Sequence, residues 1–374
     1  MLCKILFLYL SIFVEKSHTS SIPQAAAIIP LLGNNINVAW YENDKIMCRL
    51  FEGTNPDTNN TVITESSPDN VKIFPSAVYL STGNILVVWT NYHSTLNTFD
   101  IWGTIMDISC SVLIEEFQIS TETYPANNEL SAPYAAQIVM NELVIWNNGK
   151  NIVGRTLTST GVPLDQDQII YTLPGNNFNQ NFANSGNEVF VAWTNMLSTG
   201  ETYICGTLCN QFGTQPHSYI NISNNLGYLS TNPTVAGLIN TGWIITWQGQ
   251  LDSVSDPEQF YIFATIITSS GSIQPPFVIA AETYPLNTPT VFQLPDMFVF
   301  VWESNSSIVV QFLSGTTPIG DVITVSESSY QQSLPTVGVM SNYDFLVVWL
   351  EQDNYYGRMF YPNGTFIGET YQIN

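Results

Sequence analysis

Aromatic, acidic and histidine side chains gather in three segments of this chain, each following an apolar, strand-like run. Aromatic rings beside carboxylates are typical of carbohydrate sites, where a ring stacks on a sugar face and oxygens bind its hydroxyl groups. Solvated loop residues with no ligand are the alternative interpretation. The candidate ligand-binding residues are Tyr92, His93, Asp100 and Trp102, then Glu201 and Tyr203, and finally Asp252, Asp256 and Glu258.

The third of these segments is the one place where the sequence suggests a metal. Asp252, Asp256 and Glu258 supply oxygen ligands of the kind that calcium prefers, but calcium needs six to eight of them. No glycine-containing loop of regular spacing surrounds the three residues, and zinc spacings and phosphate-binding glycine loops are absent. We therefore predict no cofactor and keep calcium only as an alternative partner.

No catalytic residue can be assigned from the sequence. Beyond the first twenty positions the only histidines are His93 and His217, and no G-x-S-x-G motif occurs. A hydrolase or lyase with paired carboxylates stays an alternative, because all of the 30 acidic residues except Glu15 follow that segment.

The elements that must position these residues are marked by a repeating tryptophan. Gaps of 49, 57, 47, 54, 55 and 47 residues separate seven tryptophans that each end an apolar run. A period of this size indicates a repeat architecture in which each unit buries its face against its neighbours. We expect these indoles to pack between units and expect Trp102 and Trp243, outside the series, to be more exposed. The series is Trp40, Trp89, Trp146, Trp193, Trp247, Trp302 and Trp349.

Each unit contains four strand-like pieces and no helical periodicity. The first piece usually follows a proline, the second ends at the tryptophan, and the third carries a small residue, as at Gly103, Gly154, Gly206 and Gly357. Seven such units predict an all-β, seven-bladed β-propeller of four-stranded antiparallel blades. A β-helix has shorter periods, and separate β-sandwiches need longer units.

The unit resembles a known type of repeat. The pattern is Pro-x-Val, Val-Val-Trp, Asp-Ile-x-Gly, as in Phe74-Pro75-Ser76-Ala77-Val78, where Ala77 takes the place of the first valine, then Val88-Trp89, then Asp100-Ile101-Trp102-Gly103. This pattern is similar to the roughly fifty-residue repeats of large bacterial extracellular proteins and adhesins. The resemblance implies an extracellular propeller and supplies no catalytic residues. Members often carry a Gly- and Asp-rich stretch after the tryptophan, which is mostly missing here.

The three arginines lie at one position of the repeat. Arg49, Arg155 and Arg358 each follow a tryptophan of the series by nine residues. Three arginines resemble, in type alone, the carboxylate clamp of sialidases, which are also propellers. The Ser-x-Asp-x-Gly-x-Thr-Trp box of sialidases is absent. We therefore expect these side chains to cover blade surface with their stems.

The loops that connect the second and third strands should lie on the same face of the ring as the loops between blades. The stretches 90–100, 194–203 and 248–261 are longer than their counterparts, and we interpret them as inserted loops on that binding face.

The composition excludes some partners and favours export. The chain has 374 residues and a formal charge of −22, which repels phosphate backbones and anionic membranes. A short apolar run near the N-terminus predicts a signal peptide over 1–20, and no later segment is apolar enough to span a membrane. Acceptor triplets for glycosylation at Asn59, Asn221, Asn305 and Asn363 agree with export.

The cysteines leave two interpretations open. Cys48, Cys110, Cys205 and Cys209 allow two disulfides, although Cys205 and Cys209 lie too far apart on one strand to bond each other. We prefer isolated buried thiols, because a domain of this size needs no staples.

The resulting prediction is one propeller over 21–374, closed by blade packing without strand exchange. We interpret it as a secreted, non-enzymatic scaffold that presents a loop-rich face to a glycan or an extracellular protein, as in adhesion. The alternative is a carbohydrate-active hydrolase or lyase at the channel mouth. The expected blades are about 21–70, 71–128, 129–178, 179–230, 231–286, 287–331 and 332–374.

Overall fold

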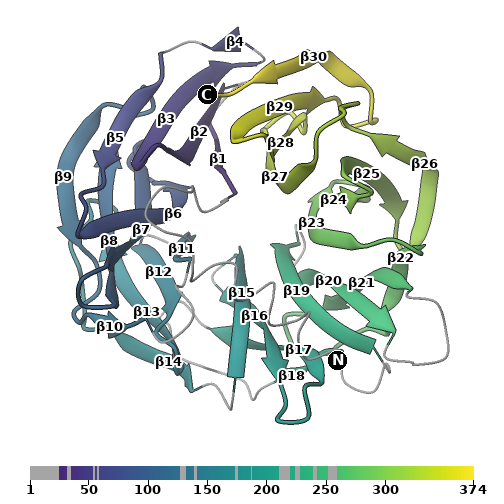
Figure 1. Cartoon of the computed structure of the whole chain (residues 1–374), viewed down its shortest axis with the longest axis horizontal. Helices are drawn as coiled ribbons and strands as arrows, with labels where there is room; N and C mark the ends of the chain where they lie inside the picture. The colour runs from purple at the N-terminus through teal and green to yellow at the C-terminus, as the bar shows by residue number, and fades with distance from the viewer. Residues whose placement is uncertain are drawn as a thin grey trace.

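The fold is a ring of seven antiparallel sheets around a central opening (Figure 1). A computed structural model describes residues 25–31, 35–53, 55–56, 59–126, 132–138, 141–172, 176–186, 188–209, 220–223, 228–238, 242–251 and 259–374. Its regular elements over these ranges are all strands, so the predicted all-β propeller of seven blades is confirmed. None of the described residues forms a helix long and apolar enough to cross a membrane. The predicted signal peptide lies outside these ranges.

Each blade takes its strands from one continuous stretch of the chain, from the inner strand to the outer one. In blades 1 and 2 the outer position is divided between two strands that both pair with the third. The strands of these two blades are β1 (Ala27–Pro30), β2 (Asn35–Glu42), β3 (Lys45–Glu52), β4 (Asn55–Pro56) and β5 (Thr61–Glu65), then β6 (Asn70–Tyr79), β7 (Ile85–His93), β8 (Thr98–Met106), β9 (Val112–Gln118) and β10 (Tyr124–Pro125).

The remaining five blades each have four strands. The strands of blade 4 begin at Asn176 and end at Asn221. Blades 3 to 5 contain β11 (Tyr134–Ile138), β12 (Asn141–Asn147), β13 (Asn151–Thr158), β14 (Gln168–Thr172), β15 (Asn176–Ser185), β16 (Glu188–Met196), β17 (Thr202–Cys209), β18 (Ile220–Asn221), β19 (Tyr228–Gly237), β20 (Trp243–Leu251), β21 (Phe260–Ile267) and β22 (Phe277–Glu282). Blades 6 and 7 contain β23 (Leu286–Leu294), β24 (Met297–Ser304), β25 (Ser307–Ser314), β26 (Thr317–Thr324), β27 (Gln332–Val339), β28 (Phe345–Glu351), β29 (Asn354–Phe360) and β30 (Phe366–Gln372).

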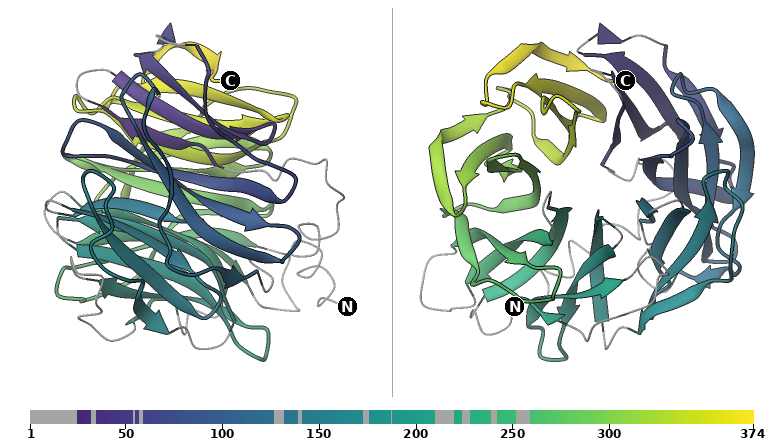
Figure 2. Two further views of the ribbon diagram at one scale, coloured as in Figure 1. Left: turned by 90° about the vertical axis from the view of Figure 1, so that its left-hand side faces the viewer. Right: turned by 180° about the vertical axis from the view of Figure 1, so that it is seen from behind.

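The core is a set of apolar layers between neighbouring blades. All seven tryptophans of the series are at most 2% exposed, and each faces the preceding blade. Trp89, for example, packs with Ile29 and Cys48 of blade 1. The strands run across the thickness of the disc (Figure 2), so each layer extends from one face of the ring to the other. Burial of these indoles supplies much of the apolar contact between blades.

Among the described strands, none is exchanged where the ring closes. The strands described for blade 7 are all C-terminal and those described for blade 1 all N-terminal, as the sequence predicts. The two blades share one apolar cluster, which includes Trp40 and Leu346. In the edge-on and rear views of Figure 2 the disc has no protruding domain among its coloured elements.

One disulfide corrects the expectation of isolated thiols. Cys48 of β3 is bonded to Cys110, which lies in the turn after β8, so the bond joins blades 1 and 2. The two residues are 62 positions apart and belong to different repeats. Their contact depends on how neighbouring blades align, which the sequence alone does not show. Cys205 and Cys209 are buried thiols outside this bond, and burial raises the pKa of Cys209 to about 12.

Two further expectations are wrong. Trp243 is fully buried, because it begins β20, packs on Phe190 and donates its indole N–H to the Ala183 carbonyl at 3.0 Å. The stretch 90–100 is mostly a longer hairpin, since β7 runs to His93 and β8 starts at Thr98. Its polar side chains are therefore held on strands.

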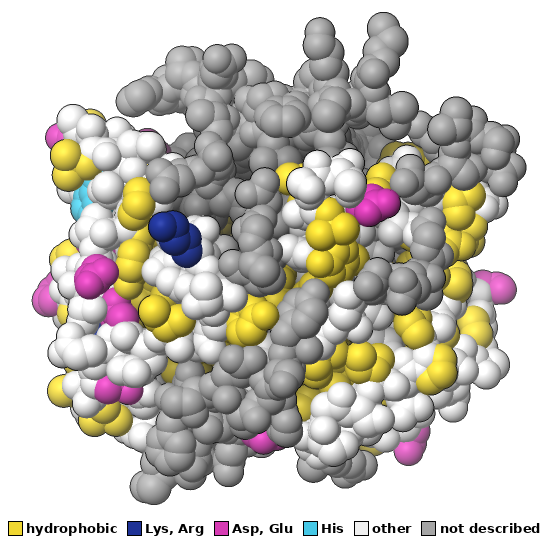
Figure 3. Space-filling model, turned by 90° about the horizontal axis from the view of Figure 1, so that it is seen from below, with side chains coloured by type: hydrophobic (Ala, Val, Ile, Leu, Met, Phe, Trp, Pro, Cys, Tyr) yellow, Lys and Arg dark blue, Asp and Glu magenta, His cyan; other side chains and the backbone are white. Residues whose placement is uncertain are grey.

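The outer surface carries few charges for its area. Seen from below in Figure 3, hydrophobic side chains lie among uncharged polar ones, with acidic groups scattered between them. This agrees with a charged fraction of only 10%.

Candidate functional site

The site is built on the long β7–β8 hairpin of blade 2. Asn91 pairs with Asp100, and Trp89 pairs with Trp102, in the antiparallel register. Because side chains alternate along a strand, Asn91, His93, Asp100 and Trp102 share the face that carries Trp89. Since Trp89 packs against blade 1, this polar group faces the junction between blades 1 and 2.

Asp100 holds the group together. Its side chain is 6% exposed, and its Oδ1 lies 3.1 Å from Nε2 of His93. The same oxygen accepts hydrogen bonds from Nδ2 of Asn91 at 3.0 Å and from Nε1 of Trp102 at 2.9 Å. A buried carboxylate with several donors fixes the side chains around it. The positions of the histidine and the indole are therefore set before any ligand arrives.

His93 has partners at both ring nitrogens. Nδ1 lies 2.6 Å from Oδ1 of Asn70, which begins β6, and Nε2 faces Asp100. A general base needs a nitrogen lone pair directed at the substrate. With both nitrogens engaged inside the protein, His93 is suited to form a fixed wall of a binding site.

Lys72 of β6 joins the two blades beside this group. Its Nζ donates to both carboxylate oxygens of Glu116 at 2.7 Å and also to the Thr64 hydroxyl on β5. Thr64 in turn donates to Glu116. The ammonium lies 5.7 Å from the ring centroid of Trp89. Its positive charge is thus largely balanced within the protein.

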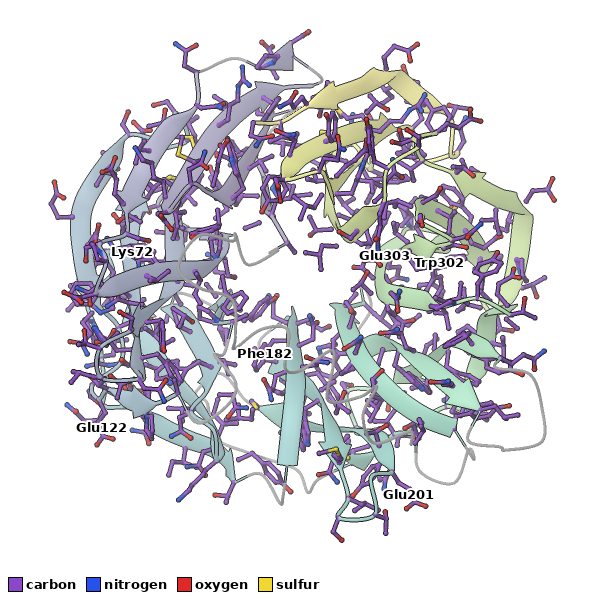
Figure 4. The ribbon with its side chains drawn as sticks, viewed as in Figure 1. Lys72, Glu122, Phe182, Glu201, Trp302 and Glu303 are labelled. Atoms are coloured by element: carbon purple, nitrogen blue, oxygen red, sulfur yellow. A yellow bond between two sulfur atoms is a disulfide. The ribbon has the colours of Figure 1, made fainter. Side chains whose placement is uncertain are left out.

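These residues surround a cavity of about 320 Å³ at the junction of blades 1 and 2. Oδ1 of Asn91 is buried and has no hydrogen-bond donor among the residues that the structure describes. In Figure 4 the labelled Lys72 lies toward the outer side of the ring and away from the central opening. The cavity is lined by Glu65, Ser67, Asn70, Lys72, Asn91, His93, Trp102 and Glu116.

The structure brings some of the predicted site residues together and separates others. His93, Asp100 and Trp102 form the group above, whereas Tyr92 points to the other face of the hairpin and donates to Oδ1 of Asn97 at 3.0 Å. Glu201 lies in the turn of blade 4, far from Lys72 around the ring (Figure 4).

The other candidates lie apart from the cavity. Tyr203 packs against the apolar layer between blades 3 and 4. Asp252, Asp256 and Glu258 lie outside the described residues. Over the described part of the chain, no group of three or more His, Cys, Asp or Glu side chains could hold a metal ion.

Asn70, Lys72, Asn91 and Glu116 were not predicted. The place of Asn91 could have been predicted from the sequence, because it follows Trp89 by two positions and therefore lies on the same face of the strand. The other three required the register between strands. Glu116 lies at a bulge in β9, between the paired residues Ile114 and Phe117, and no sequence rule locates that bulge.

The three arginines do not form a clamp. Arg49 donates to the Ile373 carbonyl at 3.1 Å, Arg358 to the Val325 carbonyl at 2.8 Å, and Arg155 to the Ile119 carbonyl. Each acceptor directly follows an outer strand of the preceding blade. The arginines therefore bind neighbouring blades to each other at three separate junctions.

One carboxyl group has an unusual environment. Glu142 on β12 is fully buried, and neither of its oxygens has a partner among the described residues. It lies four positions before Trp146, where every other repeat carries an apolar residue. Burial raises the pKa of Glu142 from 4.5 to about 7. It lines neither the cavity between blades 1 and 2 nor a second cavity beside the β12–β13 turn.

Comparison with known proteins finds likeness in structure alone. No family model matches the chain, and no curated protein matches its sequence. The polysaccharide lyase Uly1 superposes with a TM-score of 0.55 at 8% identity, covering 90% of this chain and 88% of its own. A PL25 ulvan lyase, solved with a -[GlcA(1-4)Rha3S]- ligand, gives 0.57 at 8% identity, covering 88% and 92%. The Penicillium chrysogenum α-L-arabinanase, complexed with arabinobiose, gives 0.51 at 12% identity, covering 79% and 95%.

The shared feature is the propeller fold. At these identities the superposition carries no residue of those enzymes over to this chain. A shared fold does not determine function, which depends on the side chains of a site.

Proposed function

We propose that this protein is an extracellular carbohydrate-binding propeller that holds a sugar unit in the cavity between blades 1 and 2. The observation that carries the proposal is a cavity lined by Trp102, His93 and Asn91, whose side chains are all held in place by Asp100. The partly exposed indole of Trp102 offers a face for the sugar ring, and the polar side chains that line the cavity offer hydrogen-bond partners for its hydroxyl groups. The cavity volume of about 320 Å³ falls in the range of small-molecule sites.

The charge distribution favours a neutral sugar. The chain carries a formal charge of −22, which repels a polyanion at long range. Within the cavity, Lys72 is already paired with Glu116, so it offers little attraction to a uronate or sulfate. The lysine that lines this cavity is therefore not available to pair with the acidic groups of a ligand such as -[GlcA(1-4)Rha3S]-.

One observation and two predictions from the sequence support a location outside the cell and a role in adhesion. The Cys48–Cys110 disulfide is of a kind that persists in oxidising compartments. The predicted signal peptide over 1–20 and the resemblance to repeats of bacterial extracellular proteins and adhesins point the same way. Attachment to a glycan-coated surface is the role that follows.

The test is binding of purified protein to immobilised neutral polysaccharides (xylan, arabinan, mannan and glucan) and to polyuronates as the acidic set. We expect binding to at least one neutral polysaccharide and none to the acidic set. Trp102→Ala should weaken binding at least about tenfold, a loss of about 1.4 kcal/mol. Tyr361→Ala, which removes an exposed aromatic ring from blade 7, is the matched control. Absence of neutral binding, or binding unaffected by Trp102→Ala, would refute the proposal.

Cleavage of a polysaccharide is the second candidate function. The fold shared with glycan-degrading enzymes favours it, as does Glu142, because a carboxyl group with a pKa of about 7 suits a general acid. It ranks second because Glu142 lines neither cavity. Release of reducing ends from the same polysaccharides, abolished by Glu142→Gln, would establish cleavage, and its absence would leave binding alone.

A further inference from the structure

A second cavity lies on the other side of the same hairpin. It has a volume of about 240 Å³ and lies between the end of blade 2 and the β12–β13 turn of blade 3. Tyr124 and Pro125 form β10, which pairs with Phe99 and Thr98 at the start of β8. The cavity is lined by Tyr124, Pro125, Asn148, Gly149, Lys150 and Asn151.

The two cavities occupy equivalent places in the repeat. The first lies between the segment that leaves blade 1 and the second-to-third hairpin of blade 2. The second lies between the segment that leaves blade 2 and the corresponding hairpin of blade 3. In Figure 4, Lys72 and Glu122, which precedes Tyr124 by two residues, lie on the same side of the ring.

The β7–β8 hairpin forms the ridge between the cavities. Asp100 and Trp102 face the first one, whereas Phe99, on the opposite face of β8, lies 5.7 Å from the Tyr124 ring. Tyr92 pairs with Phe99 and is partly exposed, and its bond to Asn97 fixes the end of the hairpin. An aromatic side chain therefore stands on the ridge itself.

The second cavity offers fixed apolar surface and donors. The Tyr124 hydroxyl donates to Oδ2 of Asp167 at 2.6 Å, which holds the ring in place. Oδ1 of Asn148 accepts from the backbone N–H of Asn151 at 2.9 Å, which leaves its Nδ2 as a donor. Among the described residues, the Lys150 ammonium has no carboxylate partner, unlike Lys72. These groups match the hydroxyl oxygens of a sugar. A single lysine leaves the long-range repulsion from the formal charge of −22 in place, so a polyanion is still disfavoured.

We infer that the two cavities are consecutive subsites for one polymer, a linear neutral polysaccharide that crosses the β7–β8 hairpin over Tyr92. This inference rests on the proposed function, since it requires the first cavity to hold a sugar. It adds that the ligand is a chain and that its length contributes to affinity. Binding at the second subsite becomes intramolecular once the first is filled, so affinity grows without new contacts at the first.

The test is titration calorimetry of the whole protein with neutral oligosaccharides of two to eight units, cut from xylan, arabinan, mannan and glucan. For the wild type, we expect at least one series in which the octasaccharide binds about tenfold or more tightly than the disaccharide. Lys150→Ala should remove most of this gain and leave disaccharide affinity unchanged, because Lys150 is exposed and lines the second cavity but not the first. Trp102→Ala should weaken every length.

The two proposals fail in different ways. If the disaccharide binds through Trp102 but length brings no gain, or if the gain survives Lys150→Ala, the two-subsite inference is overturned and the proposed function stands. If no oligosaccharide of any length binds, both are overturned. Tyr361→Ala should match the wild type throughout, and unchanged melting temperatures will show that the variants fold.

Discussion

The junction between blades 7 and 1 and the junction between blades 1 and 2 use the same repeat positions differently. At the first, Glu42 lies two residues after Trp40, accepts its indole N–H at 3.0 Å and also accepts from Asn374 at 3.2 Å. At the second, Asn91 lies two residues after Trp89, and its Oδ1 has no described partner. The first junction is closed by its own polar groups, whereas the second keeps an acceptor beside a cavity.

The third strand shows the same contrast. Arg49 is paired with Val38 in the register of blade 1, and Thr104 is paired with Val87 in that of blade 2. Arg49 reaches the last blade at the Ile373 carbonyl, but Thr104 bonds within its own blade to the Ile114 carbonyl. A disulfide joins blades 1 and 2 where no arginine does. The same position of the repeat therefore carries a different residue type at the closed junction and at the junction that has a cavity.

The largest expected effect comes from removing that disulfide. Replacing Cys48 and Cys110 together by alanine should lower the free energy of unfolding by about 2–4 kcal/mol, because the bond spans 62 residues. Urea denaturation of the variant and of reduced wild type measures this. If the junction of blades 1 and 2 were held by packing alone, neither sample would lose stability.

The next effect concerns the junction between blades 2 and 3, where Glu142 is buried. Burial raises the pKa of this carboxyl group from 4.5, its value when exposed in the unfolded chain, to about 7 in the folded protein, so only the folded state retains the proton between these values. Stability contributed by this group is therefore present below pH 4.5 and lost as the pH rises through 7. Glu142→Gln should be more stable than wild type by about 3 kcal/mol at about pH 8 and nearly equal to it at about pH 4.

Thermal denaturation across this pH range measures the effect. A wild-type curve parallel to that of Glu142→Gln would show that a partner stabilises the carboxylate. Glu188→Gln, at a partly exposed carboxyl group of blade 4, is the control and should show no such pH-dependent gain.

Weakening the junction between blades 7 and 1 should lower the free energy of unfolding by a somewhat smaller amount. Arg49→Ala removes a charged hydrogen bond to a carbonyl and should lower stability by about 2 kcal/mol. Arg155→Ala, at the junction of blades 2 and 3, removes the equivalent bond. Equal losses of unfolding free energy in urea denaturation would show that the junction between blades 7 and 1 is like the junction between blades 2 and 3. A much larger loss for Arg49→Ala would show that the junction between blades 7 and 1 depends on Arg49.

The smallest change exchanges the residue type that distinguishes the two junctions. Glu42→Asn gives blade 1 the side chain of blade 2 at that position. The shorter amide should lose the bonds to Trp40 and Asn374, at a cost of about 1 kcal/mol. Melting temperature measures the loss, and an unchanged value would mean that Glu42 does not close the junction.

The sequence predicted most of the scaffold and part of the site. The tryptophan spacing determined the blades because each indole is buried at the same place in its unit. His93, Asp100 and Trp102 were found because their types are unusual beside a strand. Lys72 and Glu116 were not, because their meeting depends on a bulge in β9 and on the register of the strands of blade 2. Trp243 was misjudged because a tryptophan outside a repeat pattern was expected at the surface, whereas this one fills an inter-blade layer.

The way in which blades 7 and 1 meet determines whether the chain could start at a different blade. No described strand crosses between blade 7 and blade 1, and the contacts there are made by side chains, such as that of Arg49 with the Ile373 carbonyl. Joining the ends of the folded region with a linker and cutting between two other blades would leave all seven sheets whole. Circular permutants that begin at blade 3 or blade 6 should therefore form the same disc, with the sugar cavity intact.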